Sequence, residues 1–200
     1  MKIVIAGAGE VGTHLAKMLS QENQDIILMD PNEERLKFTN NMEVLAMVGN
    51  PTSLKDLQES GIKDADLFIS VTPEEPTNIT ACMLAHSLGA HKTLARINNY
   101  EYLQPKNIEF FQKLGISSMI YPEMLAAREI VTAVQRPWAR QYWELFGGAL
   151  ILIGVKVRDN APIVNKRLTD LSLDQKLYHI VAIKRCNETI IPRGTDHIAS

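Results

Sequence analysis

The sequence predicts an α/β fold in which a doubly wound parallel sheet precedes a small α+β C-terminal module, and three observations carry this prediction. A glycine-rich turn follows the first apolar run of the chain, at residues 7–12. Short β-branched runs then alternate with helical patterns through residue 97, as expected of parallel strands joined by helices. After residue 147 the pattern changes to short strand-like runs separated by turns. We therefore expect two structural parts.

The glycine-rich turn consists of Gly7, Ala8, Gly9, Glu10, Val11 and Gly12, and it stands between an apolar strand and an amphipathic helix. In this context a Rossmann-like fold binds a pyrophosphate. Gly7 permits a turn with unusual dihedral angles, Gly9 lets the backbone approach the phosphates, and Gly12 lets helix and strand pack closely. A helix that begins at Glu10 also points free N–H groups at the phosphates.

An acidic residue, Asp30, ends the second predicted strand. It follows the glycine turn by about 20 residues, the spacing at which a carboxylate meets the ribose hydroxyls of adenosine. A 2′-phosphate beside this carboxylate would be repelled, and no arginine stands among residues 31–34 to offset it. Asp30 therefore favours NAD(H), or alternatively ATP/ADP, over NADP. The other interpretation is that Asp30 caps the next helix, and the two roles can coexist.

The remaining elements follow in order along the chain. Strands are expected at Lys2–Ala6, Asp25–Met29, Val44–Val48, Leu67–Val71 and Thr93–Ile97, with helices between them at Val11–Leu19, Glu33–Thr39, Leu54–Glu59 and Ile79–Leu88. A sixth unit comprises a helix over Tyr100–Leu114, a stop at Gly115, a strand over Ser118–Ile120 and a crossover helix from Pro122 to Gln135. Proline at a helix start is favourable because its missing N–H has no partner there.

A domain boundary is expected after the crossover helix. Arg136-Pro137-Trp138 ends that helix, and Gly147-Gly148 interrupts the chain again. We therefore predict a nucleotide-binding domain over 1–135, a linker over 136–147 and a C-terminal module over 148–200. Strands of the module are expected at Leu150–Val157, Ile180–Lys184 and Thr189–Ile191.

Ligands of doubly wound sheets lie outside the carboxyl ends of the strands, where further candidates gather. Gly49 and Asn50 would place backbone and an amide beside the adenine, or form a plain turn. Thr72 offers a hydroxyl to the phosphates or the second ribose, or forms a turn before a proline. Arg96 would supply positive charge at the phosphates, or form a surface ion pair.

Composition and charge exclude several classes of function. The net charge of −2 provides no positive field for nucleic acid. The longest uncharged stretch of the C-terminal half, residues 145–155, is too short to span a bilayer, and no secretion signal precedes the first strand. Two cysteines outside any Cys-x-x-Cys pair are too few for a disulfide framework. We therefore expect a cytoplasmic protein.

We expect no catalytic and no metal-binding residues. The five histidines are scattered without metal-ligand spacing, and Cys82 lies in an apolar helical pattern. No Gly-x-Ser-x-Gly elbow occurs, and the C-terminal part is too small for a substrate domain beside a nicotinamide. The crossover helix carries a broader apolar surface than one core requires, which favours a partner subunit or burial between domains.

Several segments resemble one family. Besides the glycine turn they are Asp30, Val48-Gly49-Asn50, Ala65-Asp66, Ser70-Val71-Thr72, Thr77-Asn78, Ala95-Arg96, Tyr121-Pro122-Glu123 and Ala127-Arg128-Glu129-Ile130. They are similar to the RCK/KTN family, the regulatory domains of potassium transport systems, and the resemblance covers the whole chain. Residues 149–157 and 190–195 resemble the start of the family's C-terminal module, so we expect more chain, including a second pair of modules, to follow.

The resemblance implies a cytosolic regulatory subunit that binds NAD(H) or ATP/ADP, dimerises through the crossover helix and assembles into a ring. It implies that the ring gates a separate potassium-conducting membrane subunit, the only link to the membrane, and that the chain performs no catalysis. The ligand residues it implies are Gly7, Gly9, Gly12, Asp30, Asn50, Thr72 and Arg96, with Glu123 a weaker candidate near a dimer-related site. Two alternatives stay open: an NAD-dependent oxidoreductase and a nucleotide-dependent scaffold.

Overall fold

The computed structural model describes residues 1–171 and 178–198. Contacts within the chain divide it into two compact units, Met1–Arg128 and Glu129–Ser200, which are described separately below. Among the described residues, no helix combines the length and the apolar character that crossing a bilayer demands.

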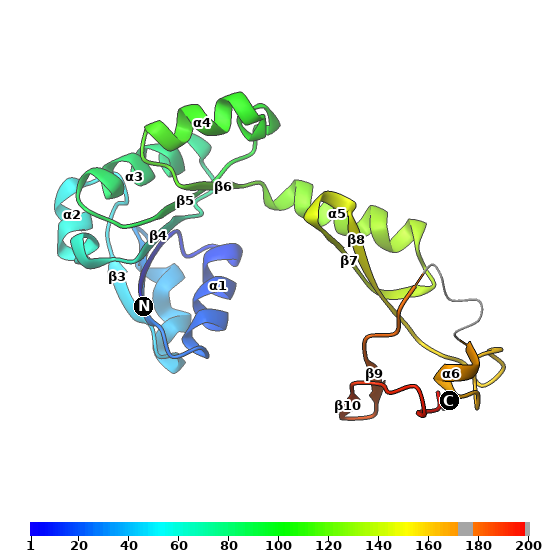
Figure 1. Ribbon diagram of the computed structural model, residues 1–200. Helices are drawn as coiled ribbons and strands as arrows, with labels where there is room; N and C mark the ends of the chain where they lie inside the picture. The colour runs from blue at the N-terminus through cyan, green and yellow to red at the C-terminus, as the bar shows by residue number, and fades with distance from the viewer. Residues whose placement is uncertain (172–177, 199–200) are drawn as a thin grey trace. The chain divides into compact units, whose positions relative to one another are not determined.

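The first unit is built on a six-stranded sheet. Its strands are β1 (Lys2–Ala6), β2 (Asp25–Asp30), β3 (Leu45–Val48), β4 (Leu67–Ser70), β5 (Thr93–Arg96) and β6 (Ser118–Ile120). They lie in the order β3-β2-β1-β4-β5-β6, and every neighbouring pair is parallel. This is the order of doubly wound dinucleotide-binding sheets, which confirms the predicted fold class. The direction of winding reverses between β1 and β4, where such sheets bind their ligands (Figure 1).

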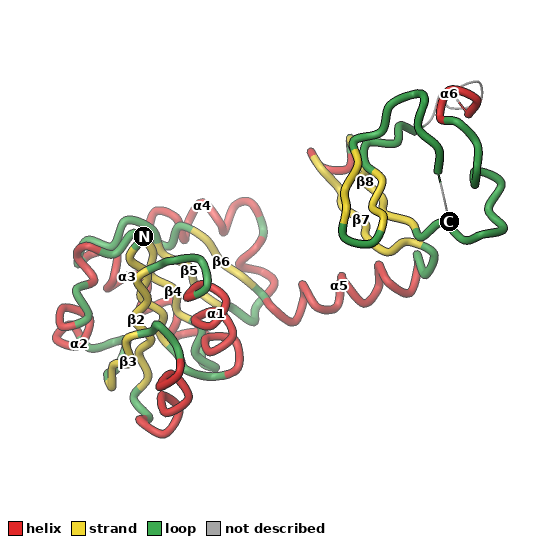
Figure 2. The backbone as a smooth tube through the Cα atoms, turned by 90° about the horizontal axis from the view of Figure 1, so that it is seen from below, coloured by secondary structure: helices red, strands yellow, loops and turns green. Residues whose placement is uncertain are grey.

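Alternating side chains of the strands bury both faces of this sheet. Ile3 and Ile5 belong to the core cluster that includes Ala16 of helix α1 (Glu10–Ser20). Val4 and Ala6 belong to the cluster that includes residues of helix α3 (Glu75–Ser87). Figure 2 shows the strands of this unit side by side among these helices. Two apolar faces on each central strand explain why the strands read as nearly continuous apolar runs.

The other helices of the unit are α2 (Leu54–Glu59) and α4 (Pro105–Lys113), with 3₁₀ helices η1 (Glu33–Asn41), η2 (Ile62–Asp64) and η3 (Tyr100–Leu103). The prediction of one helix over 100–114 is wrong, because Gln104 is extended at ψ 142° before Pro105 starts α4. The helix expected over 33–39 is of the 3₁₀ type. There the hydroxyl of Thr39 donates to the carbonyl of Leu36 at 2.7 Å, in the local bonding that disfavours regular α-helix.

The second unit is a small module of short strands. It contains β7 (Ala139–Leu145), η4 (Phe146–Gly148), β8 (Leu150–Val155), α6 (Leu168–Leu171), β9 (Ile183–Arg185) and β10 (Glu188–Ile190). Helix α5 (Pro122–Gln135), the expected crossover helix, begins in the first unit and ends in the second. Strands β9 and β10 pair antiparallel, close to where two of the predicted strands were placed.

The segment predicted to be a linker, 136–147, holds strand β7 over most of its length. Tyr142 and Trp143 have high β propensity, and they face Ile153 and Leu152 of the antiparallel strand β8. Gly147 and Gly148, with φ of 67° and 91°, lie in the turn of this hairpin. The division of the chain into domains at 135 and 148 stays a prediction.

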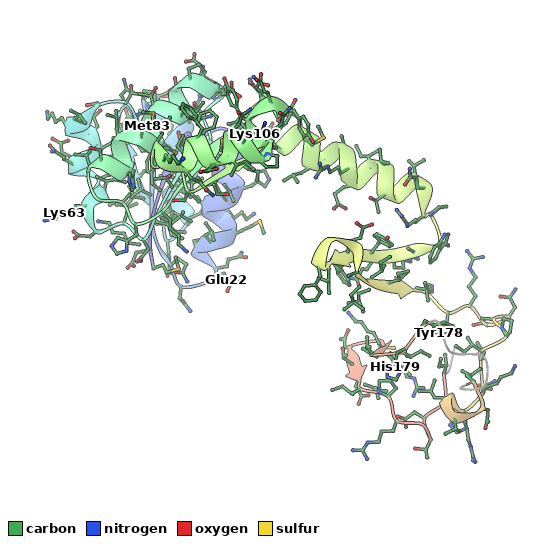
Figure 3. The ribbon with its side chains drawn as sticks, turned by 45° about the horizontal axis from the view of Figure 1, so that its top comes forward. Glu22, Lys63, Met83, Lys106, Tyr178 and His179 are labelled. Atoms are coloured by element: carbon green, nitrogen blue, oxygen red, sulfur yellow. The ribbon has the colours of Figure 1, made fainter. Side chains whose placement is uncertain are left out.

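The carboxyl edge of the first sheet is the one where function is expected. Glu22 and Lys63, labelled in Figure 3, precede β2 and β4 and therefore belong to the opposite, amino-terminal edge.

Candidate nucleotide-binding site

The glycine turn has the geometry that its sequence predicts. Gly7 has φ of 102°, a conformation that side chains rarely tolerate, and its N–H donates to the carbonyl of Met29 at 2.8 Å. A Cβ atom built on Gly7 would lie 3.0 Å from the backbone nitrogen of Thr72. The turn therefore packs against the loop after β4, and this contact brings Thr72 to the glycine turn.

Gly12 and Gly9 differ in what surrounds them. A Cβ atom on Gly12 would lie 1.8 Å from the carbonyl oxygen of Gly7, so helix and turn touch directly. Nothing lies within 4 Å of a Cβ atom on Gly9, and no side chain caps helix α1 at that residue. The open space stands at the N-terminal end of α1, where backbone N–H groups bind phosphate. The turn fits a pyrophosphate.

Asp30 lies at the carboxyl end of β2 and is 2% exposed. Its Oδ2 accepts the N–H of Ala8 and its Oδ1 accepts the N–H of Asn32, each at 2.8 Å. Each oxygen keeps a further lone pair that a ribose hydroxyl could use, and the contact of Asp30 with a ribose stays a prediction. The cap of the following helix is Asn32, whose side chain accepts the N–H of Glu34. The alternative role of Asp30 as that helix cap is therefore wrong.

A pocket of about 410 Å³ opens beside the glycine turn. It is lined by Ala8, Gly9, Glu10, Thr13, His14, Arg35 and Pro73. Val11 packs its side chain against the core cluster under α1, which leaves its backbone N–H as the group available to a ligand. The pocket thus gathers the glycine turn, the first turns of α1 and the loop after β4.

Asn78 of α3 organises the loops after β4 and β5. Its side chain is buried, and its Oδ1 accepts the hydroxyl of Ser70 at 2.9 Å. The same oxygen accepts the N–H and the hydroxyl of Thr72, both at 2.8 Å. Its Nδ2 donates to the carbonyls of Thr72 and Arg96, both at 2.9 Å. Asn78 therefore positions two predicted site residues, and the Thr72 hydroxyl is engaged in this network.

Replacing Asn78 by alanine is expected to lower the free energy of unfolding by about 2 kcal/mol, because two carbonyls and a buried hydroxyl lose their partner. Urea denaturation measures this change. Thr80→Ala, an exposed substitution on the same helix, is the matched control and should stay within about 0.5 kcal/mol. Equal stability of the two variants would contradict the role of Asn78.

The loop after β3 has the features of a turn. The N–H of Asn50 donates to Oδ2 of Asp56 at 2.7 Å, and its own Oδ1 accepts the N–H of Thr52 at 2.9 Å. Gly49 is buried, and a Cβ atom there would lie 3.2 Å from Cβ of Asp56. These contacts favour the turn interpretation of Gly49 and Asn50. Their place beside an adenine stays a prediction.

Arg96 is held in an ion pair. Its Nη2 lies 2.5 Å from Oε1 of Glu123, the second residue of α5, and its side chain is 23% exposed. The pocket beside the glycine turn is not lined by Arg96. The structure therefore favours the ion-pair interpretation, and a contact of Arg96 with phosphates stays a prediction.

Several residues of the region were not predicted as site residues. Thr13, His14, Arg35 and Pro73 line the pocket, and Asn78 positions its neighbouring loops. The Nδ1 of His14 lies 2.8 Å from the carbonyl oxygen of Glu10, one helical turn before it. Only the i, i+4 spacing from the glycine turn could have indicated that His14 faces the pocket.

The groups that would be needed for nucleophilic or metal chemistry do not gather here. Burial raises the pKa of the Cys82 thiol to about 12, although a backbone hydrogen bond with Ser70 and the side chain of Thr93 lower it. Such a thiol is not a nucleophile at neutral pH. Within residues 1–171 and 178–198, no three His, Cys, Asp or Glu side chains come together as metal ligands.

The fold and the glycine turn define a Rossmann-type domain, a class whose nucleotide-binding members hold phosphate at the first βα turn of the sheet. A sequence model of the TrkA-N domain matches residues 3–122. The chain therefore belongs to the TrkA-N domain family.

The relatives agree with this assignment. The Trk system potassium uptake protein TrkA homolog of Archaeoglobus fulgidus is 33% identical over 194 residues, which cover 97% of this chain and 44% of that protein. The homolog of Methanothermobacter thermautotrophicus is 34% identical over 195 residues, 96% of this chain and 87% of that protein. The chain thus spans less than half of the first of these relatives.

Solved structures share the fold. The GsuK channel bound to NAD superposes with a TM-score of 0.62 at 16% identity, covering 99% of this chain and 35% of that chain. GsuK bound to ADP has a TM-score of 0.56 at 18% identity, over 68% of this chain and 35% of that chain. The TrkA-N domain of the inner membrane protein ybaL from Escherichia coli has a TM-score of 0.58 at 16% identity, over 66% and 96%.

Proposed function

We propose that the chain is a ligand-sensing regulatory domain of a potassium uptake system and that its ligand is NAD(H), or alternatively ATP/ADP. The main support for this proposal is the glycine turn. Open space lies around Gly9, no side chain caps the start of α1 there, and the Asp30 carboxylate accepts the neighbouring N–H of Ala8. This arrangement suits an adenine nucleotide with its ribose at Asp30 and its phosphates over α1. The TrkA names of the relatives support the potassium transport role.

The role is regulatory and not catalytic. The pocket offers a phosphate cradle, and the expected ribose acceptor, Asp30, contacts two residues that line it, Ala8 and Arg35. The buried Cys82 thiol has a raised pKa. Glu10 and His14 line the pocket, and the Nδ1 of His14 lies against the carbonyl oxygen of Glu10. We assign neither side chain a chemical step, because a sensor needs only different affinities for its ligand in two conformations.

Self-association belongs to the same proposal. Among the residues that the structure describes in α5, none is buried, and Ile130, Val131 and Val134 are 64%, 51% and 73% exposed. Exposed apolar surface of this kind favours a partner. We infer that α5 pairs with a second copy, that dimers assemble into a ring, and that the ring gates a separate membrane subunit from the cytoplasmic side.

Calorimetric titration of the chain with NADH, NAD, ATP and NADPH tests the proposal, with NADPH expected to be the weaker of the two reduced dinucleotides. Light scattering with and without the bound nucleotide then tests whether the ligand changes the assembly. Absence of binding by all four nucleotides would refute nucleotide sensing. Consumption of bound NADH by a small carbonyl compound would establish an oxidoreductase in its place.

A further inference from the structure

Arg35 lines the pocket beside the glycine turn and lies close to Asp30. Its Nη1 is 3.8 Å from Oδ2 of Asp30, and its side chain is 51% exposed and lines the pocket. The acceptor oxygen is the one that also receives the N–H of Ala8 at 2.8 Å. The guanidinium therefore stands beside the carboxylate that the ribose hydroxyls would meet.

Local structure holds Arg35 in this place. The N–H of Arg35 donates to the carbonyl of Asn32 at 3.1 Å, at the start of η1. The next residue, Leu36, is 4% exposed and belongs to the same core cluster as Ala8 of the glycine turn. An arginine between a capped helix start and a buried leucine has its backbone placed, while its long side chain can still adjust to a ligand.

The charges of the residues around the pocket determine how Arg35 would act on a bound phosphate group. Among the described residues that line it, Arg35 carries the permanent positive charge, and Glu10 carries a negative one. Lys37, the next cation of η1, is engaged with Glu34, their Nζ and Oε1 atoms lying 2.5 Å apart. Asp30 alone would repel a 2′-phosphate, and Arg35 offsets that repulsion while presenting planar N–H donors that suit phosphate.

We propose that Arg35 is a specificity-determining residue of the nucleotide site and that it lets the site accept adenosine whose ribose carries a 2′-phosphate. The inference rests on the proposed nucleotide-binding function and names a wider ligand class for the same pocket. NADPH then binds more weakly than NADH, because Asp30 remains, but within a measurable range. The discrimination between the two dinucleotides is set jointly by the carboxylate and the guanidinium.

The test is the ratio of the dissociation constants of NADPH and NADH, measured by calorimetry for the wild-type chain and for Arg35→Gln. Loss of a charge that interacts with the phosphate at about 4 Å is expected to raise this ratio about tenfold. Lys37→Gln, which removes a cation of the same helix that is paired with Glu34, is the matched control and should leave the ratio unchanged.

Each other result counts against the inference. An unchanged ratio in Arg35→Gln, or a wild-type chain that binds NADH and shows no binding of NADPH, overturns the role of Arg35 and leaves the proposed function standing. A wild-type chain that binds neither dinucleotide nor ATP overturns the proposed function itself. Because a ratio is measured within one variant, a general loss of stability does not imitate the expected result.

Discussion

An Asp30→Ala variant is expected to bind NADH about 100-fold more weakly than the wild-type chain. The carboxylate has two tasks, because it holds the N–H of Ala8 in the glycine turn at 2.8 Å and keeps lone pairs for the ribose. Hydrogen bonds to a charged group contribute about 1.5–3 kcal/mol each, so losing the ribose contact alone accounts for a factor of this size. Titration calorimetry measures the change directly.

Asp25→Ala is the matched control, since Asp25 is an exposed aspartate at the other end of the same strand. It should bind NADH as the wild-type chain does. Thermal unfolding of both variants separates lost contacts from lost structure, because Asp30→Ala also removes two backbone partners. If Asp30→Ala stays folded and binds NADH within about threefold of the wild type, the ribose does not lie at Asp30.

A Gly12→Ala variant is expected to lose about 3 kcal/mol of unfolding free energy. The added Cβ atom would lie 1.8 Å from the carbonyl oxygen of Gly7, a backbone atom that cannot rotate away. Helix α1 or the turn must shift, and forcing volume into a closely packed contact costs free energy of this order. Urea denaturation monitored by circular dichroism measures the loss.

Gly9→Ala is the informative counterpart. Apart from Gly9 itself and its chain neighbours, no atom lies within 4 Å of the added Cβ, and φ at Gly9 is −78°, so the fold should lose less than about 1 kcal/mol. NADH binding should nevertheless fall by about tenfold or more, because the methyl group would occupy the space expected for the phosphates. Gly12→Ala that is as stable as Gly9→Ala would show that helix and turn are not in contact.

The glycine turn and the sheet were predictable because their requirements are local. A positive φ at Gly7 and close packing at Gly12 follow from residue type and spacing within one βα turn. Strand positions followed from apolar runs, whereas the order of the strands within the sheet came only from the structure. The helix expected over 100–114 is interrupted at Gln104 because Pro105 starts a new helix, and the segment 136–147 holds a strand because it has a hairpin partner.

The partners of the polar side chains were not predictable in the same way. Thr72, Asn50 and Arg96 were all placed at the carboxyl edge of the sheet, but their contacts join residues distant in the chain. Arg96 is paired with Glu123, 27 positions away, and Asn78 reaches the carbonyl of Arg96 across 18 positions. No spacing rule relates such pairs, because they meet only after the strands are assembled.

By itself, the sequence determined the fold class, the position of the glycine turn and the acidic residue at the end of β2. These features follow from backbone conformation and from the periodicity of apolar residues, which neighbouring positions specify. Only the tertiary structure decided that Asn78 holds two loops together and that Arg35 stands beside Asp30. Leu36 of η1 packs into a core cluster and so holds the neighbouring Arg35 close to Asp30. Such a contact depends on how distant segments pack together, and neither residue reveals it in the sequence.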